Sequence, residues 1–133
     1  MIVCFDTNVL ASAVATRGLC ADIVNAALAE HQLIVGETVL RELRQVLRQK
    51  LRLPVAAADE MEAFLRLHAK VIIDAPDLEI PMRDQNDRAV LAEAVAGKAH
   101  VLVTGDQDLL DLASEAPIKV LSPRGFWELL RSA

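Results

Sequence analysis

The sequence is poor in cysteine, histidine and aromatic residues, and each shortage argues against a class of protein. It has two cysteines and three histidines, and none of them forms the C-x-x-C or H-E-x-x-H pairs that bind zinc. Two scattered cysteines are typical of a protein from a reducing compartment. Aromatic residues make up 3% of the chain and tyrosine is absent, so stacking on nucleic-acid bases is not an obvious mode of binding.

The sequence also lacks an excess of positive charge and a long apolar run. Its formal net charge is −5, which argues against a broad electrostatic surface for nucleic acid but allows a local basic groove. No apolar stretch approaches the length of a membrane span, and the first residues show neither the basic segment nor the long apolar region of a signal peptide. We therefore expect a cytoplasmic protein.

Apolar residues make up 53% of the chain, and we expect a single domain over residues 1–133. Short apolar runs predict strands at 2–5, 33–35, 71–73, 101–103 and 118–121. Amphipathic segments predict helices from about 9, at 19–30, 38–50, 57–70, 84–97 and 106–113, and from 123. Asn8 is a candidate N-cap of the first helix, and Gly97 is expected to end the fifth. This alternation predicts an α/β fold with a parallel sheet covered on both faces.

Four acidic residues fall where such a sheet would gather them. Asp6 and Asp106 each follow a predicted buried strand, and Glu42 and Asp87 lie on predicted helices. Ligands of open α/β sheets bind in the crevice outside the carboxyl ends of the strands. Carboxylates crowded there repel one another unless protons or cations neutralise them. A hard divalent cation with oxygen ligands, such as Mg²⁺ or Mn²⁺, would do so.

Each acidic residue taken alone has a simpler explanation. Asp6 could cap the next helix, and Glu42 could be an ordinary solvated side chain. Asp84 and Asp87 could be placed favourably in the first turn of a helix, where acids meet its positive end. The segment 104–106 favours a functional site more strongly, because three residues suited to a tight polar turn follow a buried strand directly.

Together, these residues and their neighbours resemble the PIN domain family of metal-dependent ribonucleases. The matching motifs are Asp6-Thr7-Asn8, Leu40-x-Glu42-Leu43, Asp87 at the start of a helix, and Thr104-Gly105-Asp106-x-Asp108-Leu109-Leu110. The resemblance extends from residue 2 to about residue 127, and it is nearest to the small bacterial toxins of toxin–antitoxin pairs that are similar to VapC. Relatives often carry a proline and another acid where Gln85 and Asn86 stand, so the choice between Asp84 and Asp87 as direct ligand stays open.

The resemblance implies a three-layer α/β/α sandwich with a five-stranded parallel sheet, and an endoribonuclease that uses Mg²⁺ or Mn²⁺. It also implies an RNA substrate, a cognate antitoxin and a homodimer. The implied catalytic residues are Asp6, Glu42, Asp87 and Asp106. Of these, the implied metal ligands are Asp6, Asp87 and Asp106. The implied supporting residues are Asn8, Thr104, Asp84 and Asp108.

Binding of RNA would also need positive charge near the acidic residues. The candidate phosphate contacts are Arg17, Arg41, Arg44, Arg48 and Arg88. An ordinary solvated surface charge is the competing explanation for each of them. If they do contact RNA, cleavage should slow as salt rises, because phosphate contacts release counterions.

Three other interpretations remain open from the sequence. A receiver-like phosphoacceptor domain would use four residues near strand ends, which are Asp6, Asp74, Thr104 and Lys119, although receivers usually carry a second acid where Thr7 stands. A haloacid-dehalogenase-like phosphatase would need an aspartate where Asn8 stands. The third is a PIN-like module that has lost catalysis and only binds a partner.

Overall fold

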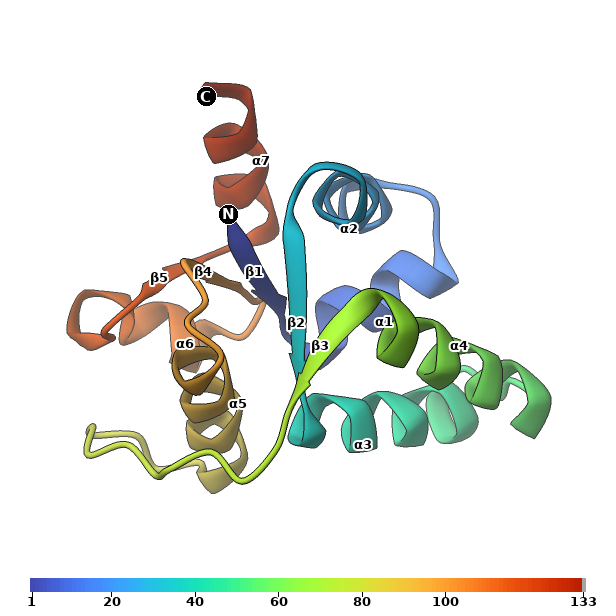
Figure 1. Ribbon diagram of the computed structural model, residues 1–133, viewed down its shortest axis with the longest axis horizontal. Coiled ribbons are helices and arrows are strands. Elements are labelled where there is room, and N and C mark those ends of the chain that lie inside the picture. Colours follow the sequence, from blue (N-terminus) through green and yellow to red (C-terminus); the bar gives the residue numbers. More distant parts are fainter. Residues whose placement is uncertain (133) are drawn as a thin grey trace.

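The computed structural model describes residues 1–132 (Figure 1). Its strands are β1 (Ile2–Phe5), β2 (Gln32–Gly36), β3 (Ala69–Ile72), β4 (Val101–Val103) and β5 (Lys119–Leu121). Its α-helices are α1 (Thr7–Ala15), α2 (Leu19–Glu30), α3 (Glu37–Gln45), α4 (Val55–His68), α5 (Gln85–Ala96), α6 (Gln107–Asp111) and α7 (Pro123–Ser132). A π-helical turn, η1 (Val46–Lys50), continues α3, and a 3₁₀ turn, η2 (Ala113–Glu115), follows α6.

All five strands are parallel, in the order β3-β2-β1-β4-β5. The chain moves outward from β1 to β3 and then returns to β4 and β5, so its winding direction reverses between β1 and β4. Because crossovers between parallel strands are right-handed, α1 to α4 cover one face, and α5 and α6 cover the other (Figure 1). The predicted three-layer α/β/α sandwich with a five-stranded parallel sheet is confirmed. The reversal is the place where ligands bind in such sheets.

The core lies on both faces of the central strands, whose side chains are almost wholly buried. Phe126 of α7 is 0% exposed and meets Phe5 of β1 edge to face, with ring centroids 5.8 Å apart. Burial raises the pKa of Cys4 in β1 to about 12, so this thiol stays protonated and packs as a small apolar residue.

Several element boundaries differ from the predicted ones. Helix α1 begins at Thr7 with Asp6 as its N-cap, so the predicted cap at Asn8 is wrong. Strand β3 begins at Ala69, two residues before the predicted start, because pairing with β2 overrides the helical pattern there. Ile73, which the pattern assigned to the strand, is 64% exposed beyond its end. The predicted helix 38–50 is α3 followed by the π-helical turn η1.

Helix α5 ends at a residue with left-handed backbone, and that residue is Lys98 (φ 60°) rather than Gly97. The Ala99 amide closes the turn by donating to the Ala94 carbonyl oxygen at 3.0 Å, as in a Schellman motif. Gly97 has φ −80°, so its backbone does not need glycine. Glycine is required there because a Cβ atom would overlap Ile34 of β2.

The two residues should therefore respond in opposite ways to substitution. Lys98→Gly is expected to stabilise the fold by about 0.5–1 kcal/mol, because glycine adopts positive φ without steric cost. Gly97→Ala is expected to destabilise it by about 1–3 kcal/mol through overpacking. Urea unfolding of the wild type and both variants measures the difference. A loss of stability in Lys98→Gly would contradict the assignment.

Among residues 1–132, no single helix is both long and apolar enough to cross a membrane. The pair α1 and α2 meets the requirement jointly by length and composition, with a bend of 105° between them.

Candidate active site

Two carboxylates leave neighbouring strands where the winding reverses. The pairing of Phe5 with Val103 places the residues that follow, Asp6 and Thr104, side by side. The Thr104 hydroxyl donates to Asp6 Oδ2 at 2.8 Å and accepts from the Asp106 amide at 3.0 Å. Thr104 itself is 0% exposed. This threonine therefore ties the ends of β1 and β4 together.

Asp6 serves as a helix cap and is also part of the acidic site. Its Oδ1 accepts from the Thr7 amide at 2.7 Å, and the residue is only 8% exposed. Burial raises the pKa of Asp6, the two hydrogen bonds oppose this, and the charge of Asp106 raises it further. The structure thus confirms that Asp6 caps the next helix, and its catalytic role stays a prediction.

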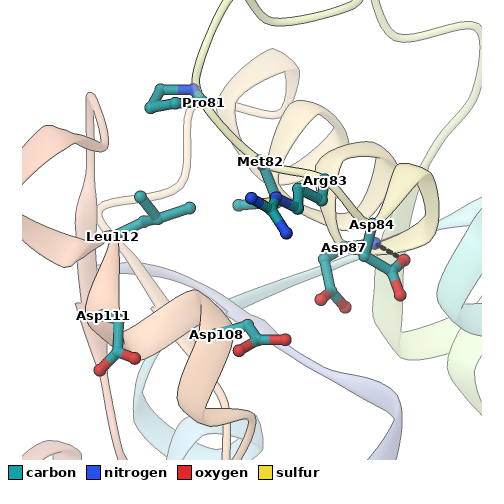
Figure 2. Close-up of a pocket in the computed structure, with 8 residues that line it drawn as sticks. All are labelled: Pro81, Met82, Arg83, Asp84, Asp87, Asp108, Asp111 and Leu112. Carbon is teal, nitrogen blue, oxygen red and sulfur yellow. Dashed lines mark hydrogen bonds between the residues drawn. The ribbon is translucent and has the colours of Figure 1, made fainter.

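Two further aspartates cap the helices that border the site. Asp106 is the N-cap of α6 and accepts from the Asp108 amide at 2.9 Å. Asp84 is the N-cap of α5 and accepts from the amides of Asn86 at 2.8 Å and Asp87 at 3.1 Å. The caps hold Asp108 and Asp87 in the first turns of their helices, where the two carboxylates come close to each other (Figure 2).

Three carboxylates are close enough to share one ion. Asp87, Asp106 and Asp108 each offer an oxygen, and these oxygens all lie within 4.8 Å of one another. Burial, followed by the charges of Asp106 and then Asp84, raises the pKa of Asp87 to about 7. The sequence suggested Asp6 as the third ligand, whereas the structure brings Asp108 into this group. We call Asp87, Asp106 and Asp108 the carboxylate triad.

Glu42 of α3 belongs to the same acidic region. It is half-buried, and burial raises its pKa; the Asn86 side chain and the charge of Arg41 oppose this, whereas the negative charges of Asp6 and Asp84 add to it. Its Oε1 is buried without a hydrogen-bond partner in the described part of the chain. A buried polar atom without a partner usually marks the place of a water, ion or ligand. Together with the oxygen donors of the carboxylate triad, this free oxygen fits a hard divalent cation and its water shell.

A cavity of about 400 Å³ lies beside the triad, and we call it the acidic hollow (Figure 2). Its polar lining is Arg83, Asp84, Asp87, Asp108 and Asp111, and its apolar lining is Pro81, Met82 and Leu112. The sequence patterns did not single out Arg83 or Asp111 as functional residues. The sequence did contain a clue to each of them. Arg83 stands directly before the Asp84 cap, and Asp111 lies one helical turn after Asp108.

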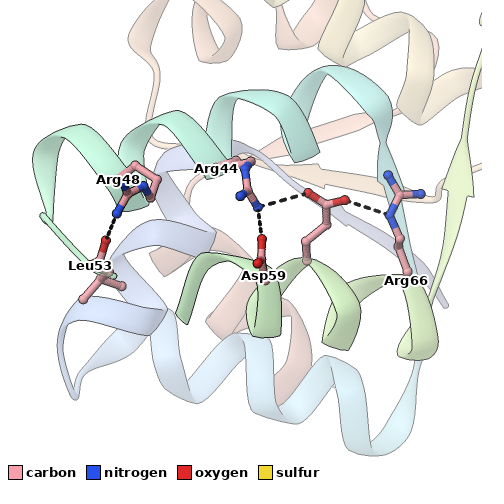
Figure 3. A network of polar contacts seen from close by, with 6 residues as sticks. Arg44, Arg48, Leu53, Asp59 and Arg66 are labelled. Carbon is pink, nitrogen blue, oxygen red and sulfur yellow. Dashed lines mark hydrogen bonds and ion pairs between the residues drawn. The ribbon is translucent and has the colours of Figure 1, made fainter. Parts of the chain in front are cut away.

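The structure gives internal partners to three of the five arginines proposed to contact RNA. Arg44 pairs with Asp59 at 2.7 Å, and Arg48 donates to the Leu53 carbonyl oxygen at 2.8 Å (Figure 3). Arg88 donates to the carbonyl oxygens of Met82 at 2.8 Å and of Ile80 at 3.3 Å. The Arg44 contact holds α3 against α4, and the Arg48 contact ties η1 to the segment before α4. The Arg88 contacts hold the loop before α5.

The remaining candidates are less constrained. Arg17 is exposed between α1 and α2, and Arg41 is exposed on α3 beside Glu42. Asn8, expected as a supporting residue, is exposed in the first turn of α1 and makes no hydrogen bond through its side chain within residues 1–132.

The strand order excludes the receiver-like interpretation. Receiver domains have the order 2-1-3-4-5, whereas this sheet has the order 3-2-1-4-5 by strand number. Asp74, the candidate phosphoacceptor, follows the edge strand β3, which lies two strands away from β1 and Asp6. The residues needed for phosphoacceptor chemistry are therefore not adjacent.

The crowding of carboxylates predicts a pH effect on the metal-free protein. Asp87 has its pKa raised from 3.8 to about 7 in the folded state, so the folded protein holds a proton that the unfolded chain releases. The stability that this bound proton provides is complete below 3.8, the pKa of Asp87 in the unfolded chain. It is lost as pH rises through about 7, the pKa in the folded state. Because the side chain is only partly buried and solvent screens its charge, we expect a loss of only about 1–2 kcal/mol.

Denaturant unfolding in EDTA at pH 5.5 and 7.5 measures this loss. In Asp87→Asn the loss should be much smaller, since the neutral amide does not titrate. Addition of Mg²⁺ or Mn²⁺ should restore wild-type stability at pH 7.5, because the cation takes over from the proton. The same pH dependence in wild type and Asp87→Asn would count against the assignment.

Comparisons with known proteins bear on this geometry. A family model described as PIN domain matches residues 2–108, which include Asp6, Glu42 and the carboxylate triad. VapBC2 from Rickettsia felis, solved with a DNA fragment from its promoter, is similar with a TM-score of 0.62 and 16% identity over 92% of this chain and 98% of that one. VapBC-1 from nontypeable Haemophilus influenzae is similar with a TM-score of 0.64 and 15% identity over 93% and 99%.

A comparison with curated proteins finds no match. At such low identities the two solved structures show a shared fold. The family model, in contrast, covers most of the chain and extends from β1 through the carboxylate triad. By this match, the chain belongs to the PIN domain family.

Proposed function

We propose that this protein is a metal-dependent endoribonuclease that hydrolyses RNA phosphodiester bonds with Mg²⁺ or Mn²⁺. The observation that carries the proposal is the meeting of Asp87, Asp106 and Asp108 within 4.8 Å at the reversal of the sheet. Such a concentration of like charge costs stability unless a cation is bound. A fold that maintains it therefore favours metal-assisted chemistry over a purely structural role, including that of an inactive binding module.

In this proposal the carboxylate triad holds the cation, with Asp6 and Glu42 beside it. A bound divalent cation supplies a more acidic water and stabilises negative charge on the phosphate. Glu42, whose Oε1 has no hydrogen-bond partner among residues 1–132, would accept a hydrogen bond from water held by the cation.

Two neighbouring residues would orient these groups without taking part in the reaction. Thr104 keeps Asp6 and Asp106 in fixed relation through its hydroxyl. Asp84 holds the first turn of α5, and with it Asp87, through its capping hydrogen bonds. We therefore propose Asp87 as the direct ligand, with Asp84 as the cap that positions it.

The test is an RNA cleavage assay with and without chelator. The purified protein should cleave single-stranded RNA in Mg²⁺ or Mn²⁺, stop in EDTA, and recover when metal is added in excess. The Asp106→Asn variant, purified in the same way, controls for contaminating ribonucleases. Cleavage in EDTA, or equal cleavage by this variant, would refute the proposal.

We also propose that the protein is the toxin of a bacterial toxin–antitoxin pair, with an antitoxin and a second copy of itself as partners. Both structural neighbours are VapBC assemblies. A cleft of about 280 Å³ beside α4 supports a protein partner, since Val14 and Phe64 line it and are each 40% exposed.

Co-purification with the product of an adjacent gene should succeed for the wild type and fail for Phe64→Asp. Sedimentation of the isolated protein as a monomer would contradict the homodimer.

A further inference from the structure

One arginine, Arg83, lines the acidic hollow, and it forms no ion pair or side-chain hydrogen bond with any described residue. Arg83, in the loop before α5, lines the hollow together with Asp87 and Asp108. Its guanidinium points into the hollow, beside Met82 (Figure 2). Within residues 1–132, no carboxylate lies within the 4.0 Å of an ion pair from it, and its side chain makes no hydrogen bond.

This uncommitted charge distinguishes Arg83 from its neighbours. Arg88, five residues later on α5, is held by the carbonyl oxygens of Ile80 and Met82. Arg44 is held by Asp59. A guanidinium that is free to move beside a group of carboxylates can bind an anion that the metal site also attracts. Arginine suits phosphate in particular, because two of its N–H groups match two phosphate oxygens.

The apolar side of the acidic hollow suits the base of a nucleotide, as Arg83 suits its phosphate. Met82 is 5% exposed, and with Pro81 and Leu112 it forms an apolar wall opposite the carboxylates. The volume of about 400 Å³ falls within the range of about 300–1,000 Å³ for small-molecule sites. An apolar wall and a free cation next to a metal site are complementary to a base and its backbone phosphate.

We infer that the acidic hollow binds one nucleotide of the RNA strand, with Arg83 contacting its phosphate and the Met82–Leu112 wall contacting its base. The inference rests on the proposed ribonuclease function and names the residues that position its substrate. Because RNA carries its phosphates at short intervals, a strand whose phosphate contacts Arg83 can place a neighbouring phosphate at the carboxylate triad. Arg83 is thus a substrate contact, and not a ligand of the metal.

The test is binding of a fluorescein-labelled single-stranded RNA in Ca²⁺ buffer, followed by anisotropy over a series of salt concentrations. Arg83→Gln should bind about 10-fold more weakly, and its salt dependence should fall by about 0.7 in log–log slope, the value for one phosphate contact on a single strand. Arg83→Lys should recover part of the affinity, since lysine also binds phosphate. Leu112→Asn should weaken binding without changing the slope, because an apolar contact releases no counterions.

The control is Arg131→Gln, in the last turn of α7, which Figure 1 shows far from α5 and α6. It should bind RNA as the wild type does. Titration of Mn²⁺ by calorimetry provides a second readout. Removing a positive charge beside the triad should leave Mn²⁺ affinity in Arg83→Gln unchanged or higher, whereas loss of a structural support would lower it.

The outcomes separate this inference from the function on which it rests. Equal RNA affinity and salt slope in wild type and Arg83→Gln, or weaker Mn²⁺ binding in the variant, would overturn the inference even if the wild type cleaves RNA. If RNA binding depends on Arg83 but the wild type cleaves no RNA in Mg²⁺ or Mn²⁺, the binding site stands and the ribonuclease assignment falls.

Discussion

Asp106→Asn is expected to reduce metal-dependent RNA cleavage by at least about 100-fold, because a bound cation contributes several kcal/mol and each 1.4 kcal/mol is a factor of ten. Asp106 is the best member of the triad for this test. Its second task is to cap α6 by accepting from the Asp108 amide, and asparagine caps a helix as well as aspartate does. The substitution therefore removes charge from the triad while keeping the local structure.

The fold should survive this change. In metal-free buffer the melting temperature of Asp106→Asn should equal or exceed that of the wild type, since a charge that raises the pKa of Asp87 is gone. The matched control is Asp22→Asn, which makes the same exchange in the first turn of α2 at an exposed position. That variant should cleave at the wild-type rate. Full activity in Asp106→Asn would remove Asp106 from the site, and a collapse in melting temperature would show that its main role is structural.

Phe126→Ala is expected to cost about 3–5 kcal/mol, the usual penalty for emptying a large aromatic site in a core. Phe126 is 0% exposed and forms an edge-to-face pair with Phe5. Phe5 is the last residue of β1, directly before Asp6, so the cavity would open beneath the active site. Against a typical total stability of about 5–15 kcal/mol, this loss would leave the fold marginal.

Denaturant unfolding followed by circular dichroism measures this cost, and the chain offers a matched control. Phe64→Ala makes the same exchange on α4 at a side chain that is 40% exposed, where we expect a loss below about 1 kcal/mol. Phe126→Leu should fall between the two, because most of the buried volume is kept. Equal losses for Phe126→Ala and Phe64→Ala would show that α7 contributes little to the core.

Much of the fold and part of the site follow from patterns that are local in the sequence. Continuous apolar runs predicted all five strands, and helical periodicity predicted the helices between them. Asp6 and Asp106 follow buried strands, and parallel strands end at one edge of their sheet, so their proximity was predictable. The pairing of Phe5 with Val103 confirms that proximity.

Other features could not be predicted because they depend on segments far apart in the chain. Ala69 and Lys70 continue the helical pattern of α4, yet they pair with Leu33 and Ile34 of β2 as strand. Gly97 looked like the left-handed end of a helix, but the approach of Ile34 is what requires a glycine there.

Glu93 shows most clearly what the sequence concealed. It lies on the helical pattern of α5 like any surface glutamate, yet it is 5% exposed and accepts from both the amide and the hydroxyl of Thr38, at 3.1 and 2.6 Å. It thereby connects α5 to the start of α3, the helix that carries Glu42. No spacing within either segment indicates this contact.

The sequence by itself determined where along the chain the strands and helices lie, though not where each one ends, and which edge of the sheet gathers acidic groups, because burial imposes a period on neighbouring residues and parallel strands share a direction. Tertiary structure alone decided that Asp108 joins Asp87 and Asp106 within 4.8 Å, that Thr104 holds Asp6, and that Arg83 keeps its charge free. The reason is physical. Distances between carboxylates, and the choice of partner for each charge, are set by packing between distant segments, and no local pattern contains that information.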